Sequence, residues 1–449
     1  MFTDELSSCP AKVPDIECSI NLVTESIDRD EILGQSYEWH LINVECRNLG
    51  SVMKVLIVGG GIGGLTAALC CHHFGHDVTV FEKASVMSEV GAGIQLSPNA
   101  MKVFNALGIE KQISEQAFRP EKIEARMGES GRHIFSIPLA QHAVQKWGAL
   151  YLHIHRADYI AALKSALETK LPNAIKTHAQ VVRYTQDASQ AVVHLADGRQ
   201  FAGDVLIGAD GIKSNIRQTM FGDDKPEFTG NVAWRVVVET EALEHPPNPT
   251  ACVWMGRGRH GVTYRLRQGK LVNFVGVVER DDWRQESWTE RGDKQDALHD
   301  FKGWHPSLTA ILERADEASL YRWALFDRKP LPRWTDGRIA LLGDAAHPML
   351  PFLAQGAAMA VEDAWSLAAN LSAVERPSEQ SLLAYEKSRL ARTSKVQAAS
   401  RANMKTFHQP SRAGQIITYG PMWAAGQLMP SIVHNRLNWL YGYGVTGEG

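Results

Sequence analysis

Hydrophobic residues occur along this chain in two kinds of pattern. Continuous apolar runs predict buried strands at residues 55–58, 77–81, 204–208 and 338–342. Apolar residues at helical spacing predict helices at residues 65–69, 98–107, 156–167 and 355–364. From about residue 228 to 330, apolar and polar residues alternate between turn residues, which favours antiparallel sheet. The pattern predicts an α/β fold, a Rossmann-like domain interleaved with an antiparallel-sheet domain and followed by a C-terminal helical segment.

The first apolar run leads into a glycine-rich turn. Gly59, Gly61 and Gly64 have the spacing of a dinucleotide-binding fingerprint between a strand and a helix. The first glycine permits the tight turn, the second lets the backbone approach a pyrophosphate, and the third lets the helix pack on the strand. The next strand ends at Glu82, about 20 residues further on, where a carboxylate can accept hydrogen bonds from a ribose. Lys83 follows it and joins the predicted cofactor-binding residues.

The fingerprint alone does not distinguish FAD from NAD, but two later motifs do. The run at 204–208 ends in Asp210-Gly211, and the run at 338–342 ends in Gly343-Asp344. Asp344 is placed to accept hydrogen bonds from a sugar-alcohol chain. The helix that begins at Gln355, Gly356 and Ala357 would direct the positive end of its dipole at an anionic reduced flavin ring. Together the three motifs predict bound FAD.

Two further segments are candidates for contact with this cofactor. The loop at 90–100 is rich in small residues, which would let a flat ring lie against the backbone, and Gln95 within it is assigned to cofactor binding. Arg156 begins the helix predicted at 156–167. It is interpreted either as a surface charge or as a ligand for a phosphate or carbonyl group of the cofactor.

Composition and charge exclude several other classes. Of 449 residues, 44% are hydrophobic and 22% are charged, as in an ordinary soluble globular protein. The net charge of −3 gives no basic surface for nucleic acid or for an anionic membrane. The longest apolar run, residues 55–71, is interrupted by glycines, so we predict no transmembrane helix. The six cysteines lack metal-ligand spacing, so we predict no metal site and a cytoplasmic location.

Residues 1–52 differ from the rest of the chain. Acidic residues are scattered through them, without the layout of a signal or transit peptide. Met53 directly precedes the first strand, so we interpret residues 1–52 as a non-essential extension, with a regulatory arm as the alternative. The remaining segments are predicted as FAD-binding residues 53–227 and 333–372, a substrate-binding sheet at 228–332 and a C-terminal helical segment at 373–449.

The motifs resemble those of the single-component, class A FAD-dependent aromatic hydroxylases, in particular the salicylate hydroxylase-like group with its hydroxybenzoate and hydroxynicotinate monooxygenases. The resemblance extends from about Met53 to Tyr443 and includes Gly303-Trp304-His305-Pro306. It implies that Glu82 binds the ribose, that Arg156 contacts the flavin and that Asp344 belongs to the ribityl motif.

The resemblance also implies a reaction cycle. NADH or NADPH reduces FAD and leaves, O₂ adds to form a flavin 4a-hydroperoxide, and the terminal oxygen attacks the electron-rich ring of a small aromatic acid. The alternatives are a flavin-bound redox sensor, with residues 1–52 as its contact arm, and another FAD-dependent oxidation such as epoxidation. The oligomeric state is left open, with a homodimer as the candidate.

Relatives of this kind place pocket residues on the first strand of the substrate domain, which here carries Trp234 and Arg235. Arg235 is interpreted either as the partner of a substrate carboxylate or as the partner of an acid in the sheet. His347 is expected near the flavin, and with Gln355 these residues form the predicted catalytic set.

His260 and Tyr264 are further acid–base candidates. Pro351-Phe352 departs from the polar pair that some 3-hydroxybenzoate 6-hydroxylases carry before the same glycine. This difference argues against gentisate formation.

Overall fold

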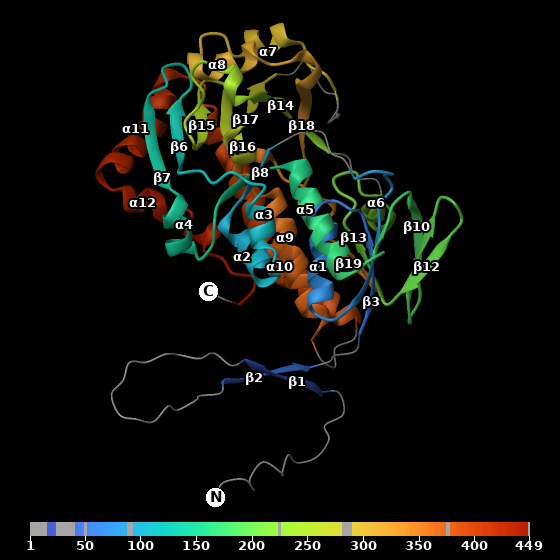
Figure 1. Ribbon diagram of the computed structural model, residues 1–449. Coiled ribbons are helices and arrows are strands. Elements are labelled where there is room, and N and C mark those ends of the chain that lie inside the picture. The colour runs from blue at the N-terminus through green and yellow to red at the C-terminus, as the bar shows by residue number, and fades with distance from the viewer. Residues whose placement is uncertain are drawn as a thin grey trace, which may run out of the picture.

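The computed structural model describes residues 16–23, 41–48, 52–87, 93–222, 226–280, 290–373 and 378–447. Within the predicted extension, β1 (Ile16–Val23) and β2 (Leu41–Asn48) pair antiparallel as a two-stranded sheet (Figure 1). The other residues of 1–51, and residues 90–92 of the glycine-rich loop, lie outside the described residues. That the extension is non-essential stays a prediction.

A six-stranded sheet forms the centre of the Rossmann-like domain. Its order is β19-β20-β13-β3-β4-β9, and every neighbouring pair is parallel except β19 with β20. The strands are β3 (Lys54–Val58), β4 (Asp77–Phe81), β9 (Ile175–Lys176), β13 (Val205–Gly208), β19 (Thr335–Asp336) and β20 (Ile339–Leu341). Parallel strands buried on both faces read as continuous apolar runs, which is the pattern that predicted them.

Helices surround this sheet (Figure 1). α1 packs against both α5 and α9, and α9 also packs against α2 and α10. The helices of this domain are α1 (Ile62–His73), α2 (Pro98–Ala106), α3 (Glu110–Ser114), α4 (Ala140–Trp147), α5 (Arg156–Lys170), α6 (Asn215–Phe221), α9 (Gly356–Leu371) and α10 (Ser378–Phe407). Two small sheets complete it, β5 (Gly93–Leu96) with β8 (Leu152–His155), and β10 (Val181–Gln186) with β11 (Ala191–Leu195) and β12 (Gln200–Gly203).

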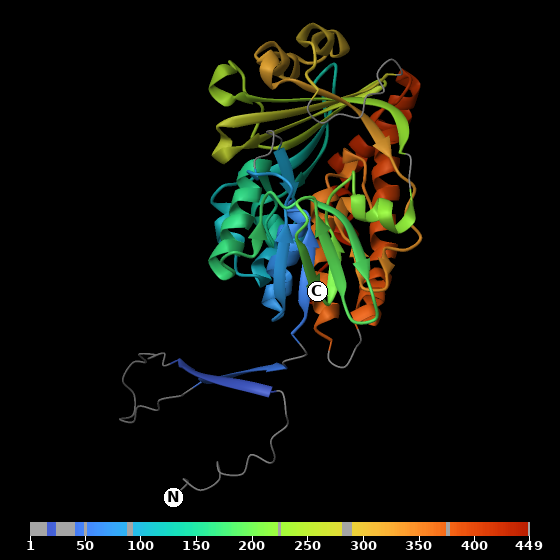
Figure 2. The ribbon, with the colours of Figure 1, turned by 90° about the vertical axis from the view of Figure 1, so that its right-hand side faces the viewer.

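A seven-stranded sheet of order β18-β14-β17-β16-β15-β6-β7 lies across one end of this domain (Figure 2). Only the β15–β6 pair is parallel. Its strands are β6 (Lys122–Met127), β7 (His133–Pro138), β14 (Glu227–Glu239), β15 (Ala251–Met255), β16 (Arg259–Leu266), β17 (Leu271–Glu279) and β18 (Tyr321–Asp327). β6 and β7 come from the segment assigned to FAD binding, so the sheet extends beyond residues 228–332.

Both faces of this sheet are covered. The outer face packs against α7 (Lys294–Asp300) and α8 (Pro306–Glu313), through a core that includes Phe274 and Phe301. The inner face packs against Leu350 and Phe352. Phe352 lies in the short helix η5 (Pro351–Leu353), and Leu350 directly precedes it. The seven-stranded sheet therefore presents its inner face to the Rossmann-like domain.

The C-terminal helices close onto the rest of the molecule. They are α11 (Arg412–Leu428), α12 (Pro430–Asn435) and α13 (Asn438–Tyr441). Arg392 of α10 donates to the carbonyl oxygens of Trp439 and Leu440, and Lys102 of α2 donates to that of Gly442. The end of the chain is thus held by charged side chains from two earlier helices.

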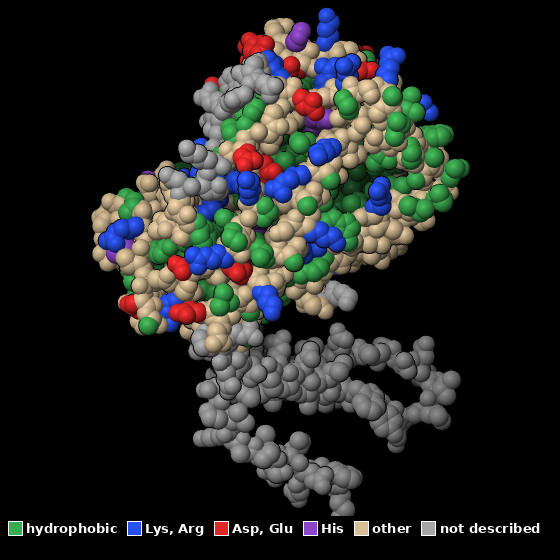
Figure 3. Space-filling model, turned by 180° about the vertical axis from the view of Figure 1, so that it is seen from behind, with side chains coloured by type: hydrophobic (Ala, Val, Ile, Leu, Met, Phe, Trp, Pro, Cys, Tyr) green, Lys and Arg blue, Asp and Glu red, His purple; other side chains and the backbone are tan. Residues whose placement is uncertain are grey.

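Apolar side chains are exposed along α11 and α12, at one edge of the molecule (Figure 3). They are Ile416, Ile417, Trp423, Leu428, Met429 and Ile432. No helix in the part of the chain that the structure describes is both long and apolar enough to cross a bilayer.

Candidate active site

The predicted phosphate turn lies between β3 and α1. Gly59 has φ +108°, and a Cβ atom there would lie 2.4 Å from the carbonyl oxygen of Ala209. A Cβ at Gly64 would lie 1.9 Å from the carbonyl oxygen of Gly59, whereas one at Gly61 would meet open space. Two glycines are therefore required by close backbone contacts, and the third faces a space that a phosphate group can enter.

Glu82 lies beside this turn at the end of β4. Its Oε2 accepts a hydrogen bond from the backbone N–H of Gly60 at 2.8 Å, and its Oε1 accepts one from the N–H of Ala84 at 2.8 Å. Each carboxylate oxygen keeps a second lone pair for a ribose hydroxyl. Lys83 is exposed to solvent next to it.

The Asp210-Gly211 and Gly343-Asp344 motifs lie side by side. Arg217 joins them, because its guanidinium donates to the carbonyl oxygen of Ile212 at 2.7 Å and to that of Ala345 at 3.1 Å. Asp210 Oδ2 accepts hydrogen bonds from the first turn of α6, while its buried Oδ1 has no hydrogen-bond partner among the described residues. Burial raises the pKa of Asp210, against the lowering effect of these hydrogen bonds and of Ser214.

Asp344 and Arg156 also come together. Asp344 is exposed to solvent, and the charges of His347, Arg156 and Arg217 favour its ionised form. Arg156 reaches this region from the start of α5, far from Asp344 in sequence but within electrostatic range of it. The acid of the predicted ribityl motif is therefore surrounded by cationic groups.

These residues fit FAD in this structure. They gather where the carboxyl ends of β3, β4, β13 and β20 meet, which is where open α/β sheets bind nucleotides. Gly356 and Ala357 begin α9, whose N-terminus has no side-chain cap. The open space beside Gly61 and the unpartnered Oδ1 of Asp210 provide room and an acceptor for the bound group.

Gln95 of β5 accepts a hydrogen bond from the Tyr151 hydroxyl at 2.6 Å.

Gln355 is 1% exposed, and its amide bonds to Ser97 at 3.0 Å and to Asn99 at 3.1 Å. Since its oxygen and nitrogen are both used inside the protein, the geometry favours a role for Gln355 in positioning the start of α9 over direct participation in the reaction.

His347 is buried against Asp363 of α9, with its Nε2 hydrogen-bonded to Asp363 Oδ2. Asp363 also pairs with Arg389 at 2.7 Å. Burial raises the pKa of Asp363, but His347 and Arg389 outweigh it and hold that pKa below its ordinary value. His347 Nδ1 is buried without a hydrogen-bond partner among the described residues. The backbone N–H of His347 also donates to the carbonyl oxygen of Gly343, so His347 lies beside the Gly343-Asp344 motif, and its place near the flavin stays a prediction.

Trp234 and Arg235 do not share a pocket, because successive side chains of a strand point to opposite faces. Trp234 lies in the outer core, fully buried, with its indole N–H donating to Asp300 at 2.7 Å. The assignment of Trp234 to the substrate pocket is therefore wrong. Arg235 lies on the inner face, with its guanidinium carbon 5.1 Å from the ring centre of Trp323. Its Nε is buried and has no hydrogen-bond partner among the described residues.

His260 and Tyr264 point to the same inner face from β16. The His260 ring lies 5.2 Å from that of Phe352, and burial lowers its pKa well below the ordinary value, as does neighbouring His408. Burial raises the pKa of Tyr264 to about 12, although the charge of Arg235 lowers it. At neutral pH, His260 is therefore a neutral acceptor and Tyr264 a protonated donor.

Comparison with known proteins identifies the class to which this site belongs. A family described as "FAD binding domain" matches residues 52–400. A 6-hydroxynicotinate 3-monooxygenase from Pseudomonas fluorescens is 38% identical over 367 residues, which cover 80% of this chain and 93% of the relative. The chain belongs to the FAD-dependent aromatic monooxygenases.

Other members of this family agree. The 3-hydroxybenzoate 6-hydroxylase 1 of Aquipseudomonas alcaligenes is 37% identical over 393 residues, covering 87% of this chain and 97% of the relative. A salicylate hydroxylase solved as a substrate complex has a TM-score of 0.73 at 28% identity, covering 88% of this chain and 96% of that one. The predicted fold, the FAD cofactor and the hydroxylase class are confirmed, and the sensor and epoxidase alternatives are not supported.

Sequence reasoning did not identify the groups behind the site. Asp363 and Arg389 anchor His347, and His408 contacts His260 from a position 148 residues away. No local motif marks these residues, because their roles depend on the packing of α9, α10 and β16. Two adjacent acids, Glu362 and Asp363, in a mainly apolar helix are the one signal that sequence offered.

Proposed function

We propose that this monooxygenase hydroxylates the ring of a small phenolic or hydroxy-heteroaromatic acid, with NADH or NADPH and O₂ as co-substrates. The observation that supports this most directly is Arg235 on the inner face, whose Nε is buried without a hydrogen-bond partner among the described residues. An unpartnered cationic donor is costly inside a protein, and a substrate carboxylate would satisfy it. Burial, with the nearby charge of Arg156, already lowers the pKa of Arg235.

The surroundings of Arg235 suit a flat aromatic ligand. Trp323 lies beneath the guanidinium, and Leu350 and Phe352 pack on the same face from the segment that precedes α9. These apolar side chains would exclude water from the reacting ring. We place the substrate ring between Arg235 and the segment 351–355.

FAD would be held by the phosphate turn, Glu82, Arg156 and Asp344, and when bound and reduced it supplies activated oxygen. The chain itself must bind the acid, orient its ring and control the hydroxyl proton. An ionised ring oxygen activates the carbons ortho and para to it. Neutral His260 is the base that we assign to this proton, and Tyr264 is the donor that would hold the ring oxygen.

The test is product formation by the purified enzyme. 6-Hydroxynicotinate, 3-hydroxybenzoate and salicylate would each be supplied with NADH or NADPH, and hydroxylated product and hydrogen peroxide would be measured per nucleotide consumed. We expect one acid to give coupled hydroxylation and the others mostly peroxide. If no aromatic acid gives a hydroxylated product, the proposed reaction is wrong.

6-Hydroxynicotinate is the first acid to test, because the chain is similar to a 6-hydroxynicotinate 3-monooxygenase and its Pro351-Phe352 departs from the polar pair of some 3-hydroxybenzoate 6-hydroxylases. We also infer a cytoplasmic location, since Cys70, Cys71 and Cys252 are free thiols. The homodimer stays a prediction, and the mass of the enzyme in solution would test it.

A further inference from the structure

The side chains of His260, His408 and Glu279 form a continuous hydrogen-bonded chain. His260 Nδ1 lies 2.7 Å from His408 Nε2, and His408 Nδ1 lies 3.1 Å from Glu279 Oε1. His260 and His408 are 2% and 5% exposed, whereas the Glu279 side chain is 56% exposed. The chain therefore begins at the buried inner face of the sheet and ends in solvent.

The inner end of this chain is free to receive a proton. Among the residues that the structure describes, the His260 ring makes its hydrogen bond through Nδ1 alone. Its neighbours, Phe352 and Phe407, have ring centres 5.2 Å away and offer no competing polar group. His260 Nε2 is thus left as the acceptor on the side of the proposed substrate.

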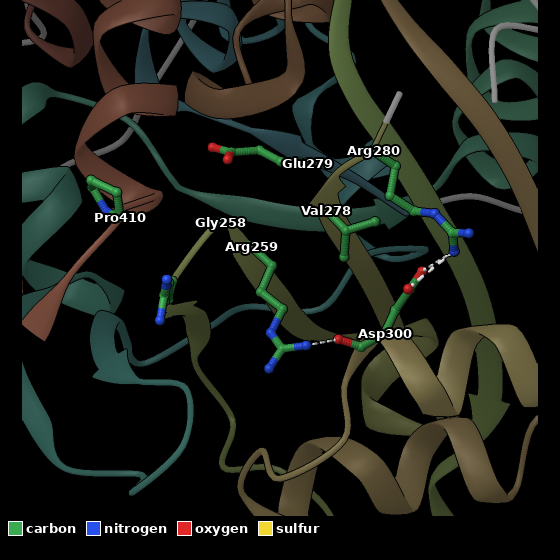
Figure 4. Close-up of a pocket in the computed structure, with 8 residues that line it drawn as sticks. Gly258, Arg259, Val278, Glu279, Arg280, Asp300 and Pro410 are labelled. Atoms are coloured by element: carbon green, nitrogen blue, oxygen red, sulfur yellow. Dashed lines mark hydrogen bonds and ion pairs between the residues drawn. The ribbon is translucent and has the colours of Figure 1, made fainter. Parts of the chain in front are cut away.

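The outer end opens into a surface pocket of about 430 Å³ at the start of β16 and the end of β17 (Figure 4). Glu279 and Pro410 line it together with Arg257, Arg259 and Arg280. Arg259 and Arg280 are both bound to Asp300. The pocket is large enough to hold several water molecules that can take up a proton from Glu279.

We propose that His408 and Glu279 form a proton relay, which carries the hydroxyl proton of the substrate from His260 to solvent. This inference rests on the proposed function. His260 Nε2 accepts the proton from the substrate hydroxyl, which becomes an oxyanion. His260 Nδ1 then passes its proton to His408 Nε2, and His408 Nδ1 passes its own to the Glu279 carboxylate. Water in the pocket removes that proton, so one proton enters, one leaves and no electrons move.

The charges around the relay suit this direction. Burial lowers the pKa of His408, although the Glu279 carboxylate raises it. His260 contacts His408 and aromatic rings, while Glu279 contacts His408 and lines the pocket together with Arg257, Arg259, Arg280 and Asp300. A proton resting on either buried histidine is therefore disfavoured, and the exposed Glu279 connects the two histidines to water. His408 and Glu279 are positioning residues, since neither touches the substrate.

The test compares Glu279→Gln and His408→Gln with wild type, using the acid that the wild type hydroxylates. Glutamine keeps the size and a hydrogen bond at each position but cannot accept and release a proton at neutral pH. We expect kcat to fall about 10-fold in either variant at about pH 6.5, with KM unchanged. Glu279→Asp should restore most of the rate. Glu241→Gln, at an exposed acid far from the relay, is the matched control and should behave as wild type.

The loss of kcat in the two variants must also require that the substrate hydroxyl has a proton to lose. With a ring-fluorinated analogue that is already ionised at the assay pH, the variants should match wild type, because no proton has to leave. A purely structural defect would persist with that analogue. Rapid mixing of enzyme and acid without nucleotide should show the oxyanion absorbance appearing about 10-fold more slowly in both variants.

If both variants have the wild-type kcat, the relay is wrong and the proposed hydroxylation still stands. The same conclusion follows if the variants lose as much activity with the ionised analogue as with the protonated acid. If wild type hydroxylates no acid, the proposed function fails and the relay fails with it.

Discussion

Replacing Arg235 by alanine tests the proposed pocket most sharply. A charge-assisted hydrogen bond from a desolvated guanidinium to a carboxylate contributes about 1.5–3 kcal/mol, which corresponds to a rise in KM of about 10-fold to 150-fold for an aromatic acid. The ring would also be held less accurately over the flavin. We therefore expect less product and more hydrogen peroxide per nucleotide consumed.

The same substitution should not weaken the fold. The Arg235 Nε is buried without a partner among the described residues, and burial lowers the pKa of this group, so its charge costs stability when no acid is bound. We expect the melting temperature of Arg235→Ala to equal or exceed that of wild type in the absence of substrate. A bound acid should raise the melting temperature of wild type but not that of the variant.

Trp234→Phe is the matched control on the neighbouring residue. It removes the hydrogen bond to Asp300 in the outer core, which should lower stability by about 1 kcal/mol and leave KM unchanged. Unchanged KM and unchanged coupling in Arg235→Ala would remove Arg235 from the pocket. A large loss of stability in that variant would show that its guanidinium pairs within the protein.

Three further predictions concern the cofactor, the extension and acid stability. Glu82→Ala and Asp344→Ala should each weaken FAD retention, measured as flavin bound per chain after gel filtration, and full occupancy in both variants would contradict the two assignments. A chain that begins at Met53 should fold and bind FAD normally, and a large drop in melting temperature would show that the extension packs on the domain. Because the pKa of Asp363 lies below its ordinary value of 3.8 in the folded protein, its stabilising effect is fully present above 3.8 and is lost as the pH falls from 3.8 through the lower pKa of the folded protein. Asp363→Asn should therefore be less stable than wild type by about 3–5 kcal/mol at neutral pH, with a smaller difference in acid, and equal melting curves across pH would refute this.

The cofactor half of the site could be predicted from sequence because each contact is encoded locally. Gly64 is required by a backbone contact within one strand–turn–helix unit, Gly59 adopts a positive φ in that turn, and Glu82 follows on the next strand. Such short-range geometry recurs whenever a phosphate binds at this place in the fold. The order of three motifs was therefore enough to identify FAD.

The substrate half was harder to predict for a physical reason. β14 is covered on both faces, so Val232, Ala233 and Trp234 are all buried and no alternation shows which side chain faces the pocket. The polar groups near the pocket depend on long-range packing, since His408 reaches His260 from the end of α10. Neither fact leaves a trace in local periodicity.

The strand order of the Rossmann-like domain has a consequence for biosynthesis. β13 lies between β3 and β20, and α1 packs against α9, yet β20 and α9 are translated long after their partners. At about 5–20 residues per second, the ribosome takes on the order of ten seconds to reach β20 after β13 has emerged. During that interval an apolar strand edge and one side of α1 lack their native partners, so we expect the nascent chain to bind chaperones that shield such surfaces until α9 has been made.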